Sequence, residues 1–210
     1  MVKIYWTDAA MLQPDSLPAL SSYRLERLGD LKVESARRAS LAAELLLIHA
    51  LGREAPETVL PLRIETDENG KPYLADGSFF FNLSHSERFS ACALADHEIG
   101  LDIQITVPCR ENLVRRFFAT EEQQAVFSSK DRDAAFSRIW CRKESFLKAV
   151  GLGLRMDLNS FSLAGDRPEL SYAGRSYAIR EKQIGNLFLC LCAESAFLPD
   201  QLTVERIEFS

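Results

Sequence analysis

The sequence predicts an α+β protein built from two halves of similar size. Its 210 residues are enough for two small domains of about 100 residues each. Hydrophobic residues make up 47% of the chain and include 13 Phe, so each half has the material for a packed core. The order of segments also supports this class, because a strand, a long helix and several strands are followed by helices and then by strands again.

The first half begins with a strand and a long helix. Residues 2–5 alternate in polarity, which is typical of a strand. Over residues 33–51 apolar side chains recur at helical spacing and Gly52 follows as a stop signal, which predicts a helix. Residues 67–70 read Asp-Glu-Asn-Gly, a hairpin-type turn suited to a ligand-facing loop. Three short apolar runs then predict antiparallel strands over residues 79–83, 89–94 and 99–105.

The second half begins with helices and ends with strands. A helix is predicted over residues 111–118, and Thr120 with Gln123 three residues later forms a capping box that opens another helix. Residues 133–150 predict a longer helix that ends at Gly151. Alternating segments predict further strands over residues 176–180 and 187–193.

These elements divide the chain into two domains of similar length. We expect the first domain to span residues 1–104 and the second to span 105–210, with the connection near 99–108. No sequence repeat relates the two, so any symmetry between them would be structural.

The composition argues against several classes of protein. The longest apolar stretch, 45–51, is far short of the ~20 residues that span a bilayer. The N-terminus reaches Asp8 without the apolar run of a secretion signal, and the five cysteines show no CxxC pair, so we expect a reducing cytoplasm. A net charge of −5 without a long basic run argues against a nucleic-acid binder. The chain also lacks the glycine-rich loops of dinucleotide-binding folds and P-loop NTPases.

Polar side chains interrupt the strand predicted over 99–105. Asp102 and Gln104 alternate with apolar residues, and the two-residue period of a strand places both on one face. The simpler interpretation is an ordinary half-exposed strand. In the functional interpretation Asp102 supplies a hard oxygen ligand to a divalent cation, with Gln104 beside it.

The long helix of the second half carries a second polar group. Trp140, Glu144 and Lys148 follow one another at i, i+4 spacing and so line one helix face, with Lys143 next to them. The simpler interpretation is a surface Glu–Lys pair worth a few tenths of a kcal/mol. In the functional interpretation Glu144 serves a metal or proton removal, while Lys143 and Lys148 neutralise phosphate. Trp140 would be a packing residue.

A third polar group follows a run of three Phe at residues 79–81. Residues 82–86, Asn-Leu-Ser-His-Ser, are expected where this strand meets a turn, and backbone N–H groups and hydroxyls can hold a phosphate in such a place. A plain polar turn is the simpler interpretation. Arg88 after this turn, Lys71 in the preceding loop and Arg38 on the first long helix could add positive charge.

Taken together, the polar groups resemble the motifs of the Sfp-type (surfactin-synthetase-activating) phosphopantetheinyl transferases. The family pattern has a Gly-Lys-Pro loop, an Asn-x-Ser-His-Ser segment, a Gly-x-Asp-x-Glu strand, a Phe-x-x-x-Glu helix and a Trp-x-x-Lys-Glu-x-x-x-Lys helix. In this chain the motifs correspond, in that order, to residues 70–72, 82–86, 100–104, 118–122 and 140–148. The similarity runs from the Arg38 helix to about Phe161.

The resemblance implies a fold and an activity. The fold would be two α+β halves related by a pseudo-twofold, each a small antiparallel sheet packed on a long helix, with coenzyme A and metal in the cleft between them. The activity would be magnesium-dependent transfer of the 4′-phosphopantetheine arm of coenzyme A to a serine of an apo acyl or peptidyl carrier protein, with release of 3′,5′-ADP. The carrier could belong to fatty acid, polyketide or nonribosomal peptide biosynthesis, and manganese could replace magnesium. We expect a cytoplasmic monomer that binds neither nucleic acid nor membrane.

The resemblance also implies roles for individual residues. The catalytic residues would be Glu144, Lys148 and Asp102. Asp102, Gln104 and Glu144 would hold the metal. The residues expected to contact coenzyme A are Arg38, Lys71, Pro72, Ser84, His85, Lys143 and Lys148.

One position departs from the family pattern. The usual second carboxylate of the strand is Gln104 here, and an amide oxygen can ligate magnesium but brings no charge. Three arrangements stay open. Gln104 still coordinates the metal, water fills its place, or Glu122 contributes more than usual.

The expected reaction needs a proton acceptor, a positive charge near the phosphates and a surface where the carrier protein docks. Glu144 is the candidate acceptor of the serine proton, and Lys148 would neutralise charge on the phosphates. Carrier proteins are usually acidic around the modified serine. We therefore predict docking near Arg110, Arg115 and Arg116, with Phe117 or Phe118 in apolar contact.

Two alternatives to an active transferase stay open. One is a catalytically weakened coenzyme A-binding module, for which Gln104 is the support in the sequence. The other is a carrier-protein-binding scaffold, which absence of coenzyme A affinity would favour.

Overall fold

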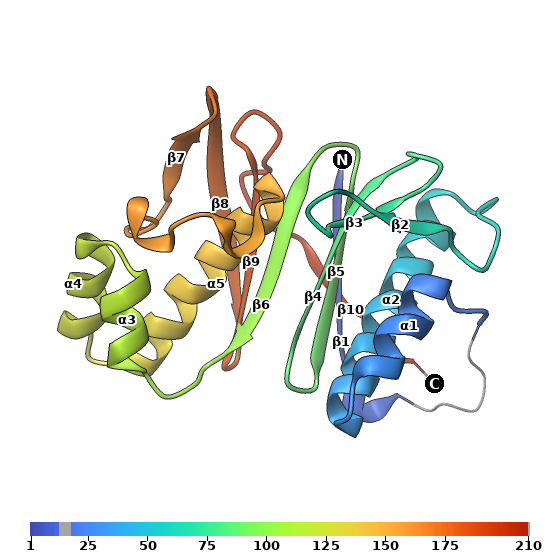
Figure 1. Cartoon of the computed structure of the whole chain (residues 1–210), viewed down its shortest axis with the longest axis horizontal. Helices are drawn as coiled ribbons and strands as arrows, with labels where there is room; N and C mark the ends of the chain where they lie inside the picture. Colours follow the sequence, from blue (N-terminus) through green and yellow to red (C-terminus); the bar gives the residue numbers. More distant parts are fainter. Residues whose placement is uncertain (13–17, 210) are drawn as a thin grey trace. The chain divides into compact units, whose positions relative to one another are not determined.

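The computed structural model describes residues 1–12 and 18–209, which form two compact units (Figure 1). The first unit comprises Met1–Glu98 and Thr203–Ser210, and the second comprises Ile99–Leu202. Each unit contains one four-stranded sheet and one long helix. The predicted α+β class is therefore confirmed, whereas the pseudo-twofold relation between the halves stays a prediction.

The first unit is built on a sheet of strand order β10-β1-β5-β4. Antiparallel ladders join β1 to β5 and β5 to β4, and β10 pairs with β1 in parallel. A separate hairpin is formed by β2 and β3. The elements are β1 Val2–Asp8, η1 Ala9–Met11, α1 Ser22–Asp30, α2 Glu34–Glu54, β2 Ile64–Thr66, β3 Pro72–Leu74, β4 Phe80–Ser86, β5 Phe89–Ala95 and β10 Val204–Arg206.

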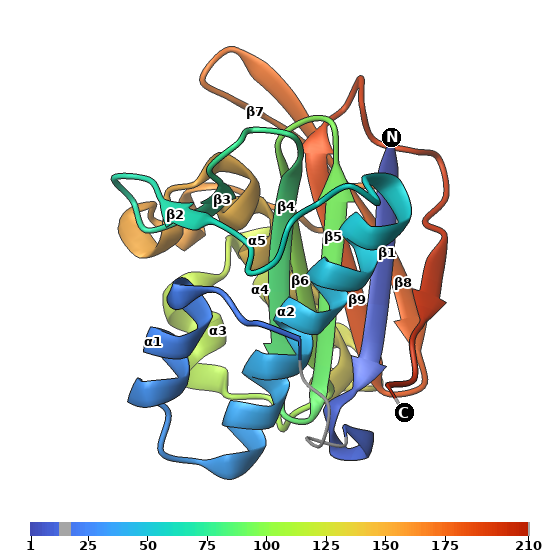
Figure 2. The same cartoon turned by 90° about the vertical axis from the view of Figure 1, so that its right-hand side faces the viewer.

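Helix α2 covers one face of this sheet (Figure 2). Its buried residues Leu46, Leu47 and Leu51 form a core with Phe81 and Leu94 of the strands. Full burial of such a side chain is worth roughly 1.5–3 kcal/mol, so this packing is a main source of the unit's stability.

A buried polar network fastens α1 to α2. Glu44 of α2 is 0% exposed, and its carboxylate accepts hydrogen bonds from the backbone N–H and the hydroxyl of Ser21. The guanidinium of Arg24 donates to the same carboxylate at 3.2 Å and to the Ser40 hydroxyl at 2.7 Å. Helix α1 was not predicted, and the residue that it buries is the charged Arg24, whose partner Glu44 lies on α2.

The second unit is built on an antiparallel sheet of order β6-β9-β8-β7. Helix α5 packs along β6 and β9 (Figure 1). Asp131 caps its first turn by accepting from the N–H of Ala134, and Gly151 ends it in the left-handed region at φ 72°. The elements are β6 Ile99–Ile105, α3 Glu111–Phe117, α4 Thr120–Ser128, α5 Arg132–Val150, η3 Gly153–Arg155, η4 Leu158–Ser160, β7 Glu169–Tyr172, β8 Arg175–Ile184 and β9 Leu187–Glu194.

The predicted domain boundary at 104/105 is corrected to Glu98/Ile99. Strand β6 pairs with β9, which lies far along the chain, and so belongs to the sheet of the second unit. The connection near 99–108 is for the same reason mostly a strand of the second unit. The first unit also includes 203–209, because β10 adds to its sheet beside β1.

The predicted capping box is also corrected. The N-cap of helix α4 is Ala119, one residue before the predicted Thr120. The Glu122 carboxylate accepts a hydrogen bond from the Ala119 N–H at 2.8 Å. Thr120 and Gln123 therefore do not form the box.

Among residues 1–12 and 18–209, no helix has the length and apolar character needed to cross a membrane.

Candidate functional site

The second unit brings Asp102, Glu144 and Lys148 together. The ammonium of Lys148 on α5 donates to Asp102 Oδ1 at 2.7 Å and to the Leu101 carbonyl at 3.1 Å. Glu144 lies one turn earlier on α5, close enough to feel the charges of both Asp102 and Lys148. The structure thus places two carboxylates and one ammonium at the point where α5 crosses β6.

Gly100 makes this close approach possible. A Cβ atom at position 100 would lie 2.0 Å from the Ser145 carbonyl oxygen and 2.2 Å from the Ala149 backbone nitrogen, so only glycine lets α5 rest on β6 here. Because Ser145 and Ala149 flank the turn of α5 after Glu144, the glycine decides how near Lys148 comes to the strand.

Substitution of this glycine should loosen the contact between helix and strand. We expect Gly100→Ala to lower the free energy of unfolding by about 3 kcal/mol, because the added carbon meets backbone that cannot move without displacing α5. Chemical denaturation would measure the change. The matched control is Gly52→Ala in α2, which meets nothing within 4 Å and should be neutral or stabilising by up to about 1 kcal/mol. Equal stability of the Gly100 variant and the wild type would contradict the account.

The pKa of Glu144 is shifted by its surroundings in this cluster. Burial raises the pKa of the Glu144 carboxyl, the negative charge of Asp102 raises it further, and Lys148 opposes both. Within the part of the chain that the structure describes, no hydrogen bond or ion pair to another side chain holds the Glu144 carboxylate. A second cation beside Glu144 would stabilise its charged form.

Gln104 lies on the same sheet face as Asp102, as predicted. Gln104 and Asp102 are two positions apart on β6 and face Phe188 and Cys190 of β9 in the ladder. The Gln104 amide N–H donates to the Ile105 carbonyl at 2.9 Å, which leaves its oxygen as the atom suited to a metal.

This donor set suits magnesium better than it suits a metal caged by protein alone. No group of three or more His, Cys, Asp or Glu side chains able to hold a metal occurs in the described ranges. Magnesium usually keeps several waters and takes one or two carboxylates plus substrate phosphates. Asp102 and Glu144 are two carboxylates of this kind, and Gln104 lies on the same face of β6 as Asp102.

Lys143 is not available to a phosphate, which corrects its assignment as a coenzyme-binding residue. Its side chain is 1% exposed and pairs with the fully buried Glu122 at 2.7 Å. It also donates to the carbonyls of Leu158 at 2.6 Å and Phe161 at 2.9 Å. Burial lowers the pKa of this ammonium, and Glu122 opposes the shift.

Glu122 is likewise committed to structure. Besides Lys143 and Ala119, its carboxylate accepts from the Leu163 backbone N–H at 2.7 Å. One carboxylate therefore joins α4, α5 and the segment after η4. The interpretation in which Glu122 contributes more than usual to a metal is wrong, because its oxygens are taken by three donors inside the core.

Trp140 packs as predicted. Its ring contacts Phe117, Phe118 and Phe136 at centroid distances of 6.2, 6.4 and 6.1 Å. This aromatic cluster joins α3 to α5.

In the first unit, His85 and Arg38 lie on the α2 side of the sheet. Strand β4 extends through Ser86, so His85 belongs to a strand and not to the turn that we predicted. His85 faces Ser90 across the ladder, and the Ser90 hydroxyl donates to the Ala39 carbonyl of α2. Arg38, the neighbour of Ala39, is exposed and pairs with Glu34 at 3.2 Å.

Ser84 lies on the opposite face of the same sheet. Adjacent strand residues point to opposite sides, and Ser84 faces Ala91 rather than Ser90. The side chain is buried at 5% exposure. Within this unit Ser84 and His85 are therefore not brought together.

Lys71 and Pro72 lie where the β2–β3 hairpin turns. Gly70 adopts φ 84°, the left-handed conformation that suits glycine in such a turn, and Pro72 begins β3 opposite Thr66. The ammonium of Lys71 reaches Glu98 at 2.5 Å. Glu98 was not predicted as a partner of Lys71, because twenty-six residues lie between them and no local pattern joins them.

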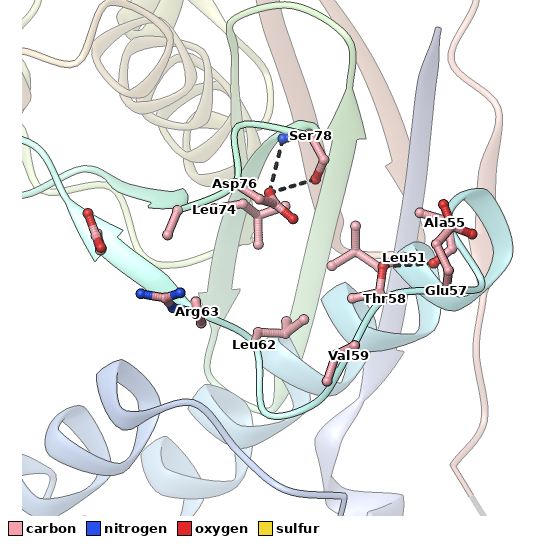
Figure 3. Close-up of a pocket in the computed structure, with 12 residues that line it drawn as sticks. Leu51, Ala55, Glu57, Thr58, Val59, Leu62, Arg63, Leu74, Asp76 and Ser78 are labelled. Atoms are coloured by element: carbon pink, nitrogen blue, oxygen red, sulfur yellow. Dashed lines mark hydrogen bonds between the residues drawn. The ribbon is translucent and has the colours of Figure 1, made fainter.

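A pocket of about 430 Å³ lies elsewhere in the first unit (Figure 3). Its floor is apolar, formed by Leu51, Leu62 and Leu74, and its edge carries charged residues such as Arg63 and Asp76. None of the predicted site residues lines it. The pocket is therefore separate from the chemistry that the motifs indicate.

Helix α3 presents the arginines expected to meet a carrier protein. Arg115 and Arg116 are exposed, and their guanidinium groups lie over the rings of Phe127 at 5.0 Å and Phe117 at 4.9 Å. Phe118 is 1% exposed, so it cannot offer apolar contact to a partner. Phe117 alone of the two can do so.

Comparison with known proteins finds a family match over the part of the chain that contains the polar cluster of the second unit. Residues 98–192 match the family described as "4'-phosphopantetheinyl transferase superfamily". The predicted resemblance is confirmed. The matched range contains Gly100, Asp102, Glu144 and Lys148.

Several phosphopantetheinyl transferases are similar to this chain over part of their length. Sfp of Bacillus subtilis (strain 168) is 36% identical over 134 residues, which cover 62% of this chain and 59% of that protein. The transferase psf-1 of Bacillus pumilus is 34% identical over 128 residues, covering 60% and 55%. HetI of Nostoc sp. is 32% identical over 149 residues, covering 67% and 63%. The chain thus spans less than two thirds of the length of these relatives.

One solved structure shows a weak likeness to part of this chain. The crystal structure of Thermotoga maritima holo-[acyl-carrier-protein] synthase is 16% identical, with a TM-score of 0.34 over 48% of this chain and 71% of that chain. A TM-score this low defines no common architecture.

Proposed function

We propose that this protein transfers the 4′-phosphopantetheine arm of coenzyme A to a serine of an apo carrier protein, with release of 3′,5′-ADP. The observation that carries the proposal is the cluster of Asp102, Glu144 and Lys148, with the Lys148 ammonium 2.7 Å from Asp102. This cluster lies inside the range that matches the transferase superfamily. The named activity of the relatives supports the same reaction.

The reaction is a phosphoryl-type transfer. The serine hydroxyl oxygen forms a bond to the β-phosphorus of coenzyme A, and the bond from that phosphorus to the bridging oxygen of 3′,5′-ADP breaks. Glu144 accepts the serine proton, since burial makes its carboxyl more basic than an exposed one. Lys148 turns its ammonium from Asp102 toward the pyrophosphate and neutralises the charge that grows on the leaving group.

Magnesium is the metal that the donor set suits. Asp102, Glu144 and the oxygen of Gln104 would hold it, and manganese could take the same place. When bound, the ion would supply positive charge to the pyrophosphate oxygens.

We also propose coenzyme-binding roles for residues of the first unit. We assign Arg38, Lys71 and His85 to the phosphates of coenzyme A, with Ser84 and Pro72 as further contacts. Carrier proteins would dock on α3 through Arg115 and Arg116, which offer exposed positive charge for an acidic partner. The enzyme would act as a cytoplasmic monomer on carriers of fatty acid, polyketide or nonribosomal peptide biosynthesis.

Intact-mass spectrometry tests the proposal. Several apo carrier proteins are incubated with this protein, coenzyme A and magnesium, and a gain equal to one phosphopantetheine group on at least one of them is expected. Omission of the protein is the control. If no carrier gains mass while coenzyme A still binds, the chain is a coenzyme A-binding module and not a transferase. If coenzyme A does not bind either, a carrier-binding scaffold is favoured.

The missing strand carboxylate should affect the demand for metal. We expect Gln104→Glu to lower the magnesium concentration for half-maximal rate by about tenfold, because a third negative group strengthens a hard-cation site. Gln183→Glu is the matched control, since Gln183 faces the same Phe188 from the other side of β9 and also donates to a carbonyl. An equal effect of both variants would show that the response reflects general charge and not coordination.

A further inference from the structure

Lys71 is held in place by its own hairpin. Its backbone N–H donates to Asp67 Oδ1 at 2.9 Å, and its carbonyl accepts from the Asp67 N–H at 3.0 Å. Asn69 donates to the same Asp67 oxygen at 2.8 Å. These bonds fix the direction in which the Lys71 side chain leaves the turn.

The ammonium of Lys71 ends on the carboxylate of Glu98. The Nζ–Oε2 distance is 2.5 Å, and the Lys71 side chain is 17% exposed whereas that of Glu98 is 51% exposed. Glu98 is the last residue before β6, the strand that carries Asp102. The ion pair therefore joins the Gly-Lys-Pro loop to the segment that leads into the catalytic strand.

We infer that Glu98 competes with a phosphate of coenzyme A for Lys71 and thereby sets the affinity for the coenzyme. This inference rests on the proposed function. Carboxylate and phosphate oxygens are the same kind of acceptor for an ammonium, and Glu98 already occupies the acceptor position. Lys71 has three N–H donors, but a phosphate placed beside the Glu98 carboxylate would be repelled by it. Coenzyme binding must therefore either break the Lys71–Glu98 ion pair or proceed against the repulsion between the phosphate and the Glu98 carboxylate.

The exposure of the two side chains indicates which of them moves. Lys71 is mostly covered and its backbone is fixed by the turn, whereas half of the Glu98 side chain faces solvent. Glu98 can swing away at little cost, and Lys71 then meets the phosphate without a change in the hairpin. Because solvent reaches the Glu98 side of this ion pair, its loss should change affinity by a modest factor.

Isothermal titration calorimetry of the full chain with coenzyme A tests the inference. We expect Glu98→Gln to tighten binding about two- to fivefold, because the competing charge is removed while the side chain keeps its shape. The gain should vanish in a Lys71→Ala background, since the competition needs the ammonium. Glu68→Gln is the matched control, because it removes an exposed carboxylate from the same hairpin and should leave affinity unchanged.

A second titrant identifies the competing phosphate. Dephospho-coenzyme A lacks the 3′-phosphate, so a gain seen with coenzyme A alone assigns the competition to that group, and a gain with both assigns it to the pyrophosphate. Binding that Glu98→Gln leaves unchanged, or that Glu68→Gln tightens equally, overturns the inference while the proposed function stands. No binding of coenzyme A by any of the proteins overturns both.

Discussion

Glu144→Gln is expected to lower kcat for phosphopantetheine transfer by about 10²–10⁴-fold and to leave the free energy of unfolding within about 1 kcal/mol of the wild type. The amide keeps the shape of the side chain but cannot accept the serine proton and brings no charge to a metal. Stability should hold because the charged carboxylate is itself costly here. Burial and the neighbouring Asp102 both raise the pKa of Glu144, so the neutral amide removes an unfavourable charge.

The measurement is the initial rate of mass gain on an apo carrier, with chemical denaturation of the same samples. Glu169→Gln is the matched control, because Glu169 is exposed on β7 and its loss makes the same change in net charge. A variant that keeps near wild-type kcat would remove Glu144 from the catalytic group. A variant that loses several kcal/mol of stability would assign Glu144 to the fold.

Lys143→Met is expected to lower the free energy of unfolding by about 3–5 kcal/mol. The reason is that Glu122 is 0% exposed and Lys143 is its charged partner, so the variant leaves a buried carboxylate without a counter-charge. Two backbone carbonyls, those of Leu158 and Phe161, would also lose their donor.

Urea or guanidinium denaturation measures this loss. Lys182→Met is the control, since Lys182 is exposed on β8 and its replacement should cost less than about 0.5 kcal/mol. Adding Glu122→Gln to Lys143→Met should recover part of the stability, because the unpaired charge is gone. If Lys143→Met is as stable as the wild type and instead raises the Kd for coenzyme A, Lys143 contacts the coenzyme after all.

Local patterns predicted most helices and strands of this protein. The helix predicted over 33–51 is α2, Glu34–Glu54, and the one predicted over 133–150 is α5, Arg132–Val150. Both carry apolar faces long enough to show helical spacing. Short elements such as β2 and β3 were missed, because three residues carry no period and these strands pair only with each other.

Strand partners could not be predicted. The runs over 89–94 and 99–105, which form β5 and β6, are adjacent in the sequence. Strand β5 nevertheless pairs with β4, whereas β6 pairs with β9. A strand's sequence records which of its faces is buried and not which strand donates to it. The domain boundary was therefore placed too late in the chain.

The sequence alone predicts the α+β class, the long helices and the residue types of the site, because periodicity and motif spacing are local properties. It placed Asp102 and Gln104 on one strand face and Glu144 and Lys148 on one helix face. Packing between distant segments brings Lys148 to Asp102, buries Lys143 against Glu122 and pairs Lys71 with Glu98, so these contacts could not be predicted from the sequence. Lys143 and Glu144 are neighbours in the chain and both belong to the same motif. Lys143 and Glu144 point to different sides of α5. The elements that pack against each side lie tens of residues away in the chain, and they decide that Lys143 is a core residue and Glu144 a site residue.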